Sequence, residues 1–232
     1  MDRVGDAFVW PFRDPQWLEK LAIIGLILLI PIVGAINAIG WMLATIDRLR
    51  AGEERLPPAN FSYLGRGFEL FVVFLVYGLG VLIVAAVFFV PALILLITQG
   101  SASGNTALAL VGVALTMVAF AVTVIGYLGM YFVRPAVVLA TLAGGIGGGL
   151  ALDRVLRRVR ESPINTLIAG LMLIAAGFIG GLGAYACFVG IIFTIPFSLA
   201  MEAWIIRSYE LGATAPAPQE GLNVGHSTAP RR

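Results

Sequence analysis

Hydrophobic residues in this chain form long runs that are separated by short polar segments. Residues 70–133 contain no Asp, Glu, Lys or Arg, and residues 162–201 contain none either. A helix needs about 20 apolar residues to cross the hydrocarbon core of a bilayer, so each run is long enough for two crossings. The pattern predicts an all-α fold: a polytopic transmembrane helical bundle of about six helical segments, arranged as three hairpins, with interfacial amphipathic helices.

The polar segments divide a single membrane domain, residues 1–212, into six parts. In chain order we expect an interfacial segment, a first hairpin, a cytoplasmic connector, a second hairpin, a glycine-rich hinge with a basic amphipathic helix, and a third hairpin: residues 1–20, 21–46, 47–67, 68–133, 134–161 and 162–209. Residues 213–232 are rich in Ala, Pro and Gly, a composition that predicts a disordered tail.

Residues 21–46 are short for a hairpin. Two full crossings with a turn need about 40 residues. One tilted span fits the length but leaves Arg13 and Lys20 on the far side of the membrane. A single span and a short or re-entrant hairpin are therefore the two alternatives.

An internal repeat favours the hairpin. Residues 13–26 resemble residues 161–174, with a proline in each, and residues 42–52 resemble residues 202–212. Because the second unit is long enough to cross and return, a shared fold makes the first unit a shallow hairpin that turns at residues 31–34. Irregular backbone at that depth needs protein around it, so we expect this hairpin to pack among the other helices.

Aromatic residues, prolines and glycines mark the expected ends of the helices. Trp10, Phe12 and Trp17 predict a segment at headgroup depth, where aromatic rings are enriched. The second long helix of the first charge-free run is expected to end at Arg134 and the proline after it, with the arginine reaching the headgroups. The GGLG sequence at residues 180–183 is expected to turn the last hairpin.

A short segment after the glycine-rich stretch is strongly amphipathic. Four aliphatic residues fall on one helical face and four arginines fill the remainder: Leu152, Val155, Leu156 and Val159, and Arg154, Arg157, Arg158 and Arg160. This pattern is typical of a helix on a membrane surface, and the arginines are candidate contacts for anionic lipid headgroups or a partner. The preceding GGIGGG sequence at residues 144–149 is expected to be a hinge or a close-packing face.

The arginines also indicate the orientation. Residues 47–69 contain four arginines and residues 134–161 contain five, whereas the loop at residues 99–105 has no Lys or Arg. The positive-inside rule places both basic segments in the cytoplasm and the loop outside. Both chain termini are then expected to be cytoplasmic.

Composition limits the chemistry that the chain can perform. Charged residues make up 12% of the 232 residues, and the formal net charge of +2 is too small to predict nucleic-acid binding. Cys187 is the only cysteine, and the only histidine, His226, lies in the predicted tail. One cysteine excludes an intramolecular disulfide, the two residues cannot make a zinc cage, and a membrane domain without histidine has no Ser-His dyad. We expect no enzymatic activity, no catalytic residue, no metal and no cofactor.

Three residues are weak candidates for a polar site: Asn37, Thr194 and Glu202. Glu202 follows 40 charge-free residues, and a carboxylate inside a membrane is costly, although Arg207 lies close enough in sequence for Glu202 to reach the interface. In a carrier the three side chains should face one cavity near the middle of the bilayer. In a scaffold they should be dispersed.

The sequences PFRDPQW, RLRAGEERLP and FSYLGRGFELFVV resemble a family of small prokaryotic multi-pass membrane proteins that is catalogued as a domain of unknown function. The resemblance covers roughly residues 6–212, and a looser similarity links it to the membrane region of some glycerophosphodiester phosphodiesterases. It implies a helical protein of the prokaryotic plasma (inner) membrane and carries no known chemistry. One departure is PPANFSYLG, where the family more often has acidic and Trp residues after Leu-Pro.

These features predict a non-enzymatic integral membrane protein that is an accessory or scaffold subunit of a membrane complex. The expected partners are the bilayer, anionic lipid headgroups on the cytoplasmic face, and a membrane-protein partner or a second copy of the chain, with no nucleic acid. The alternative is a small transporter or lipid-handling protein, because transporters are often built from repeats with broken helices.

Overall fold

The computed structural model describes residues 3–99, 105–185 and 189–214. Within these ranges the chain is helical apart from turns and one loop and has no strand, so the all-α prediction is confirmed. The α-helices are α1 (Trp17–Leu28), α2 (Val33–Arg50), α3 (Leu64–Gln99), α4 (Thr106–Gly149), α5 (Leu152–Glu161), α6 (Pro163–Leu182) and α7 (Val189–Thr214). The 3-10 helices are η1 (Val4–Phe8), η2 (Trp10–Arg13) and η3 (Gly183–Tyr185). Most of the predicted outer loop, Cys187 and the tail from residue 215 lie outside the described residues.

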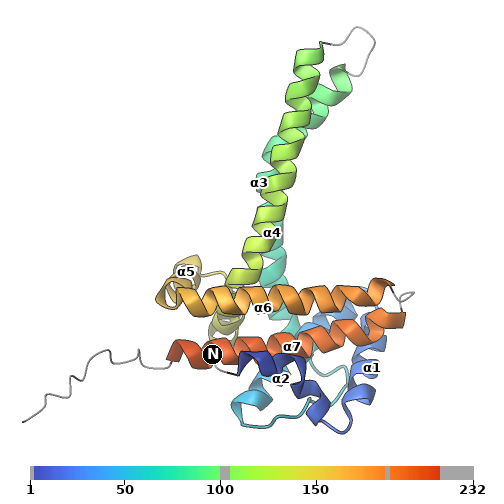
Figure 1. Cartoon of the computed structure of the whole chain (residues 1–232), viewed down its shortest axis with the longest axis vertical. Helices are drawn as coiled ribbons and strands as arrows, with labels where there is room; N and C mark the ends of the chain where they lie inside the picture. Colours follow the sequence, from blue (N-terminus) through green and yellow to red (C-terminus); the bar gives the residue numbers. More distant parts are fainter. Residues whose placement is uncertain (1–2, 100–104, 186–188, 215–232) are drawn as a thin grey trace, which may run out of the picture.

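The helices α3 and α4 form a long arm that projects from a body made by the other helices (Figure 1). They pack side by side: a Cβ added at Gly112 would lie 3.0 Å from Leu96, and one added at Gly126 would lie 2.6 Å from Val81. The helices α6 and α7 run across the base of the arm rather than along it (Figure 1). In this view α5 lies level with α6, and α1 and α2 lie below α7.

Four helical segments within the described ranges are long and apolar enough to cross a membrane: Leu64–Thr98, Thr106–Gly149, Pro163–Tyr185 and Val189–Gly212. Only 11% of the residues in the most apolar stretch of α3, and likewise of α4, are buried within the protein, against 56% in α7. The chain is therefore a membrane protein with an exposed arm and with α7 at the centre of its body.

The core of the body forms around α7. Met201, Ile205 and Tyr209 are fully buried there, and α1, α2 and α6 all pack against this helix. A Cβ added at Gly25 would lie 1.8 Å from the carbonyl oxygen of Ile192, so only glycine lets α1 approach the backbone of α7 so closely. Close packing of these apolar side chains and glycines holds α1, α2 and α6 against α7.

The first apolar run is divided into two helices, α1 and α2. The helix breaks between Leu28 and Val33, where Pro31 lacks an N–H donor and Ile32 has a positive φ of 63°. With 12 residues, α1 is about 18 Å long, too short to cross a hydrocarbon core of about 30 Å. The structure therefore has two helices here, as in the hairpin alternative, rather than one straight helix. The turn between them lies at residues 29–32, about two residues before the predicted turn at residues 31–34. Its depth in the bilayer stays a prediction.

Trp10 was expected at headgroup depth, but it is buried inside the protein. Its side chain is fully buried, its Nε1 donates to the carbonyl of Ala200 at 3.2 Å, and its ring stacks on Trp204 at a centroid distance of 5.5 Å. The indole of Trp204 donates in turn to the carbonyl of Arg3 at 2.8 Å. The N-terminal segment thus packs on α7 because both indole N–H groups find partners inside the protein.

The expectation that a helix ends at Arg134 and Pro135 is wrong, because α4 continues to Gly149. Pro135 lies inside the helix and is buried, so packing at the base of the arm compensates for the hydrogen bond that proline removes. The helical path is interrupted instead at Gly144 and Gly145, where Gly145 has φ 59° and ψ −153°. The glycine-rich stretch therefore contains a kink, at the position where a hinge was predicted.

The GGLG sequence is not the turn itself, because α6 continues through Gly180 to Leu182. Gly180 and Gly183 serve close packing against α7. A Cβ at Gly180 would lie 2.9 Å from the hydroxyl of Ser198, and one at Gly183 would lie 2.2 Å from the hydroxyl of Thr194. The last glycine of the GGLG sequence, Gly183, follows α6 and begins η3.

Candidate functional site

An ion pair joins the base of the arm to α7. The guanidinium of Arg134 on α4 faces the carboxylate of Glu202: Nη1 donates to Oε1 at 3.2 Å, and Nη2 lies 3.1 Å from Oε2. The side chain of Glu202 is only 4% exposed. Arg134 was expected to reach the headgroups, and the structure turns it toward this buried acid instead. Arg207, the nearest basic residue to Glu202 in sequence, pairs with Glu210 at 2.6 Å.

An apolar cavity lies beside Arg134 at the base of the arm. Its volume is about 410 Å³, and it is lined by Phe74, Leu75, Gly78, Leu79, Leu82, Tyr127, Met130, Tyr131 and Arg134. The guanidinium carbon of Arg134 lies 5.1 Å from the centre of the Phe74 ring, and its Nε finds no hydrogen-bond partner in the described part of the chain. The lining is therefore apolar apart from the two tyrosine hydroxyls and Arg134, whose charge is already paired with Glu202.

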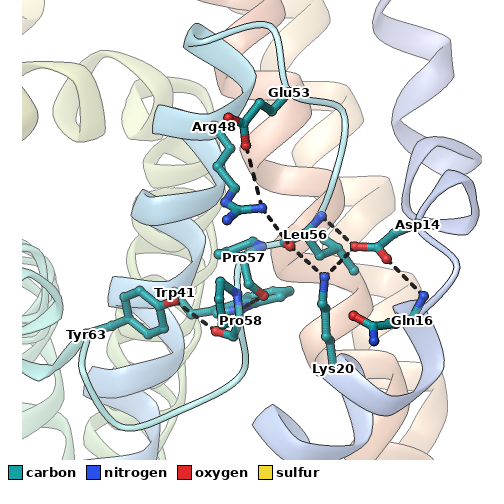
Figure 2. A network of polar contacts seen from close by, with 10 residues as sticks. All are labelled: Asp14, Gln16, Lys20, Trp41, Arg48, Glu53, Leu56, Pro57, Pro58 and Tyr63. Atoms are coloured by element: carbon teal, nitrogen blue, oxygen red, sulfur yellow. Dashed lines mark hydrogen bonds and ion pairs between the residues drawn. The ribbon is translucent and has the colours of Figure 1, made fainter.

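A second network fastens the connector after α2 to the N-terminal segment (Figure 2). Asp14 is 2% exposed, and its carboxylate accepts hydrogen bonds from Nζ of Lys20 at 2.7 Å and from the backbone N–H groups of Leu56 and Gln16, each at 2.9 Å. Lys20 also donates to the carbonyl of Leu56 at 2.9 Å, and Arg48 donates to the same oxygen at 3.3 Å. Both backbone groups of Leu56 are thereby bound by charged side chains.

The electrostatics of Asp14 favour its ionised form. Burial alone would raise the pKa of this carboxyl, but the hydrogen bonds from Lys20, Gln16 and Leu56, together with the charge of Lys20, hold its pKa below the usual value of 3.8. Two aromatic side chains also bind the backbone of the connector. The indole of Trp41 donates to the carbonyl of Pro57 at 3.3 Å, and the hydroxyl of Tyr63 donates to the carbonyl of Pro58 at 2.8 Å (Figure 2). The network therefore acts as a lock on the connector.

A third group of charges holds the C-terminal ends of α2 and α7 together. Nε and Nη2 of Arg50 donate to the two carboxylate oxygens of Glu210 at 3.1 and 2.8 Å. Each helix also has an internal pair three residues apart, between Asp47 and Arg50 at 3.5 Å and between Arg207 and Glu210 at 2.6 Å. These ends correspond to residues 42–52 and 202–212, which resemble each other in sequence.

The predicted basic helix is α5, and its arginines form a polar cavity against α4. The cavity, about 230 Å³, is lined by Arg154, Arg157, Arg158 and Glu161 together with Ala136, Ala140 and Ala143. Arg160 does not belong to this lining and is exposed. Of the aliphatic face, Val155 is buried and Val159 is half-buried, while Leu152 and Leu156 are exposed. The helix therefore has one edge packed on the body and both apolar and basic groups available on its surface.

Asn37 and Thr194 bind different parts of the fold. The amide of Asn37 is fully buried; its Nδ2 donates to the carbonyl of Asn60 at 2.8 Å, and its Oδ1 accepts from the N–H of Tyr63 at 3.3 Å. The hydroxyl of Thr194 donates to the carbonyl of Gly180 at 2.8 Å. Neither residue, nor Glu202, lines the 410 Å³ cavity at the base of the arm. Each of the three candidates thus has its own partner on a different element.

A metal site is not formed by the residues that the structure describes, among which no group of three or more His, Cys, Asp or Glu side chains could hold an ion. The arginines of α5 can bind acidic groups, and the cavity beside Arg134 can accept an apolar chain. The networks around Asp14 and Glu210 fix the connector and the ends of α2 and α7.

Fold and composition together define an all-α membrane protein. Residues 23–189 match the family described as a protein of unknown function, DUF4013, and the chain belongs to this family. The predicted resemblance to a family of unknown function is thereby confirmed, whereas the similarity to glycerophosphodiester phosphodiesterases stays a prediction. Neither a curated protein nor a solved structure matches the chain.

Sequence reasoning missed the lock at Asp14 and the contact between Arg50 and Glu210. Asp14 lies 42 residues from Leu56, and no local sequence pattern predicts the hydrogen bond from the N–H of Leu56 to its carboxylate. For Arg50 and Glu210 a signal was present, because the two residues occupy the same position of the repeat and have opposite charges. If residues 42–52 and 202–212 pack side by side with their ends aligned, opposite charges at matching positions predict an ion pair between them.

Proposed function

We propose that this protein is a non-enzymatic accessory or scaffold subunit of a membrane complex, held in a prokaryotic plasma membrane with both termini and both basic segments in the cytoplasm. The observation that supports this role is the dispersal of Asn37, Thr194 and Glu202. Each side chain is engaged with a different element of the fold, at Asn60, Gly180 and Arg134. A carrier would need such groups to face one shared cavity.

The arm is the surface offered to a membrane-protein partner or to a second copy. Large apolar side chains point outward along both helices, among them Ile83 and Ile97 on α3 and Phe120 and Ile125 on α4. Helices associate in a membrane by close packing rather than by the hydrophobic effect, so a long apolar hairpin with glycine positions can receive a partner helix. Gly80 and Gly129 leave open space where a side chain would otherwise stand.

The basic helix α5 supplies contacts with anionic headgroups on the cytoplasmic face. Arg154, Arg157 and Arg158 converge on one polar cavity, and Arg160 is exposed beside it. Arginine forks suit phosphate oxygens, and basic surface helices are attracted to anionic membranes. This contact would orient the body against the membrane without any chemistry of its own.

Site-specific photo-crosslinking in native membranes tests the scaffold role. A photoreactive amino acid is placed singly at Phe120 or Ile125 on the arm, and at the buried Ile205 of α7 as the matched control. The scaffold role predicts one discrete protein adduct from the arm positions and none from Ile205. Adducts of lipid alone from every arm position would contradict it.

A lipid-handling protein is the second candidate, and the apolar groove beside Arg134 favours it. For this candidate the purified protein should retain a stoichiometric acidic lipid that is lost in Arg134→Gln. Mass spectrometry of the protein purified in mild detergent distinguishes the two roles, because a scaffold retains a protein partner instead.

A further inference from the structure

The four candidate spans cannot all stand upright in one bilayer. The helices α6 and α7 run across the base of the arm formed by α3 and α4 (Figure 1). Helices that span a membrane lie within about 40° of its normal. Either the arm crosses the bilayer and the α6–α7 pair lies flat, or the reverse holds. The lengths and the exposed side chains distinguish these two orientations.

The arm has the length of one bilayer crossing. On α3, Val73 is buried in the body, and Tyr77 donates to the carbonyl of Gly149 at 2.9 Å at the edge of the body. Residues 78–99 continue beyond this edge, about 22 residues or about 33 Å at the helical rise. This length matches the hydrocarbon core of about 30 Å, and the segment contains no charged residue.

The helix α6 has two unlike faces. Ala169, Leu173 and Ala176 are fully buried on one of them. Large apolar residues on the other face are exposed by 44% to 72%: Ile164, Leu167, Leu171, Phe178 and Leu182. Their spacing follows the helical period, so they form one apolar stripe along the whole helix. We call these five residues the α6 stripe.

The α6 stripe faces the side of the body from which the arm projects. The buried face of α6 packs on α7, where Thr194 donates to the carbonyl of Gly180, and α6 lies on the arm side of α7 (Figure 1). A flank of α6 touches the arm itself, since a Cβ at Gly170 would lie 2.2 Å from Phe132. The stripe is opposite α7 and therefore borders the space around the arm, which the bilayer fills if the arm crosses it.

The helix α5 lies at the same level as α6 (Figure 1) and has the composition of an interfacial helix. Leu152 and Leu156 are exposed, and so are three of its four arginines, beside the acids Asp153 and Glu161. Aliphatic groups beside arginines suit the boundary between acyl chains and headgroups. Two independent helices thus mark one plane at the base of the arm.

We propose that, of the four candidate spans, α3 and α4 alone cross the bilayer, and that α6 lies flat in the interface on the side of the basic segments, with the α6 stripe against the acyl chains of that leaflet. The third hairpin of the sequence prediction then does not cross. Covered by α6, the apolar helix α7 is shielded from water, in keeping with its high burial. This orientation does not depend on the scaffold role, which has its own test.

Depth measurements on spin-labelled protein test this orientation. In a Cys187→Ser background, the full chain receives one nitroxide at a time at each stripe position, and the matched series uses exposed arm positions: Leu79, Ile83, Val87, Val90, Ile94 and Ile97. The proteins are reconstituted in phosphatidylcholine–phosphatidylglycerol vesicles. The ratio of collision rates with oxygen and with a water-soluble nickel chelate gives the depth of each label.

The expected profile is flat and shallow along α6, and on the arm it rises to a maximum near Val87 and falls again. A maximum near Leu171 with shallow values at Ile164 and Leu182 would show that α6 crosses, and would overturn the proposal. Water-like accessibility along the whole stripe would overturn it as well. All labelled positions are exposed, and circular dichroism of each variant confirms that the helices are intact.

Discussion

Arg50 and Glu210 form a two-pronged ion pair between the ends of α2 and α7, and they occupy the same position of an internal repeat. The matching positions three residues earlier, Asp47 and Arg207, are also opposite in charge. One unit therefore ends with an acid followed by a base, and the other with a base followed by an acid. Two copies with the same charge order would repel at this contact, so the reversal allows the two ends to meet.

A double-mutant cycle should detect this contact. Arg50→Gln and Glu210→Gln each remove one partner, and because the pair is bidentate and half-buried we expect a coupling energy of about 1 kcal/mol. Thermal unfolding in mild detergent gives the four stabilities. The exposed pair Arg157 and Glu161, 3.9 Å apart, is the matched control and should show a much smaller coupling. Additive effects of the two substitutions at Arg50 and Glu210 would contradict the contact.

The pair at the base of the arm should respond differently, because it is buried. Arg134→Met leaves the carboxylate of Glu202 buried without its partner, and such a loss costs about 3–5 kcal/mol. The double variant Arg134→Met, Glu202→Leu removes both charges and should regain most of that stability. Unfolding of the single and double variants in detergent is the measurement. If the double variant is no more stable than Arg134→Met, the ion pair does not join the arm to α7.

The sequence predicts the helical class and the basic helix α5, because these depend on hydrophobic period and charge within one segment. The internal repeat favours the first helical pair over a single span, and the structure has that pair. The sequence misplaces the helix end at Pro135, since burial at the base of the arm outweighs the local preference of proline. It also misses the lock at Asp14, which joins residues 42 positions apart. Contacts of this kind depend on how the helices pack, and no local pattern records them.

The lock at Asp14 should make stability depend on pH in acid. Its pKa is lower in the folded protein than its usual value of 3.8, so the stabilisation is complete above that value and is lost as pH falls through the folded pKa. We expect the melting temperature to fall on acidification below about pH 4, and Asp14→Asn to lack part of this dependence.

Unfolding between pH 6 and pH 3 in detergent measures the effect. Asp153→Asn, an exposed carboxylate on α5, is the matched control and should behave as the unchanged protein does. Limited proteolysis of the connector adds a local readout, because Asp14→Asn removes the charge that binds Lys20 and the N–H of Leu56 and should speed cleavage there. An acid profile of Asp14→Asn that equals the original would show that the lock contributes nothing.

A lysine placed in the arm should be far more damaging than one placed on the α6 stripe. Val87 is exposed near the middle of the arm, where a lysine in the hydrocarbon core costs about 2.5–3.5 kcal/mol. Leu171 is exposed on α6, where a lysine at the interface can extend its amine to the headgroups. We therefore expect Val87→Lys to lower the amount of protein integrated in membranes severalfold and Leu171→Lys to change it little.

Alkaline extraction of membranes followed by immunoblotting quantifies both, with Val87→Leu and Leu171→Val as controls for side-chain size. Equal losses for the two lysine variants would place Leu171 as deep in the bilayer as Val87, and α6 would then be a crossing helix.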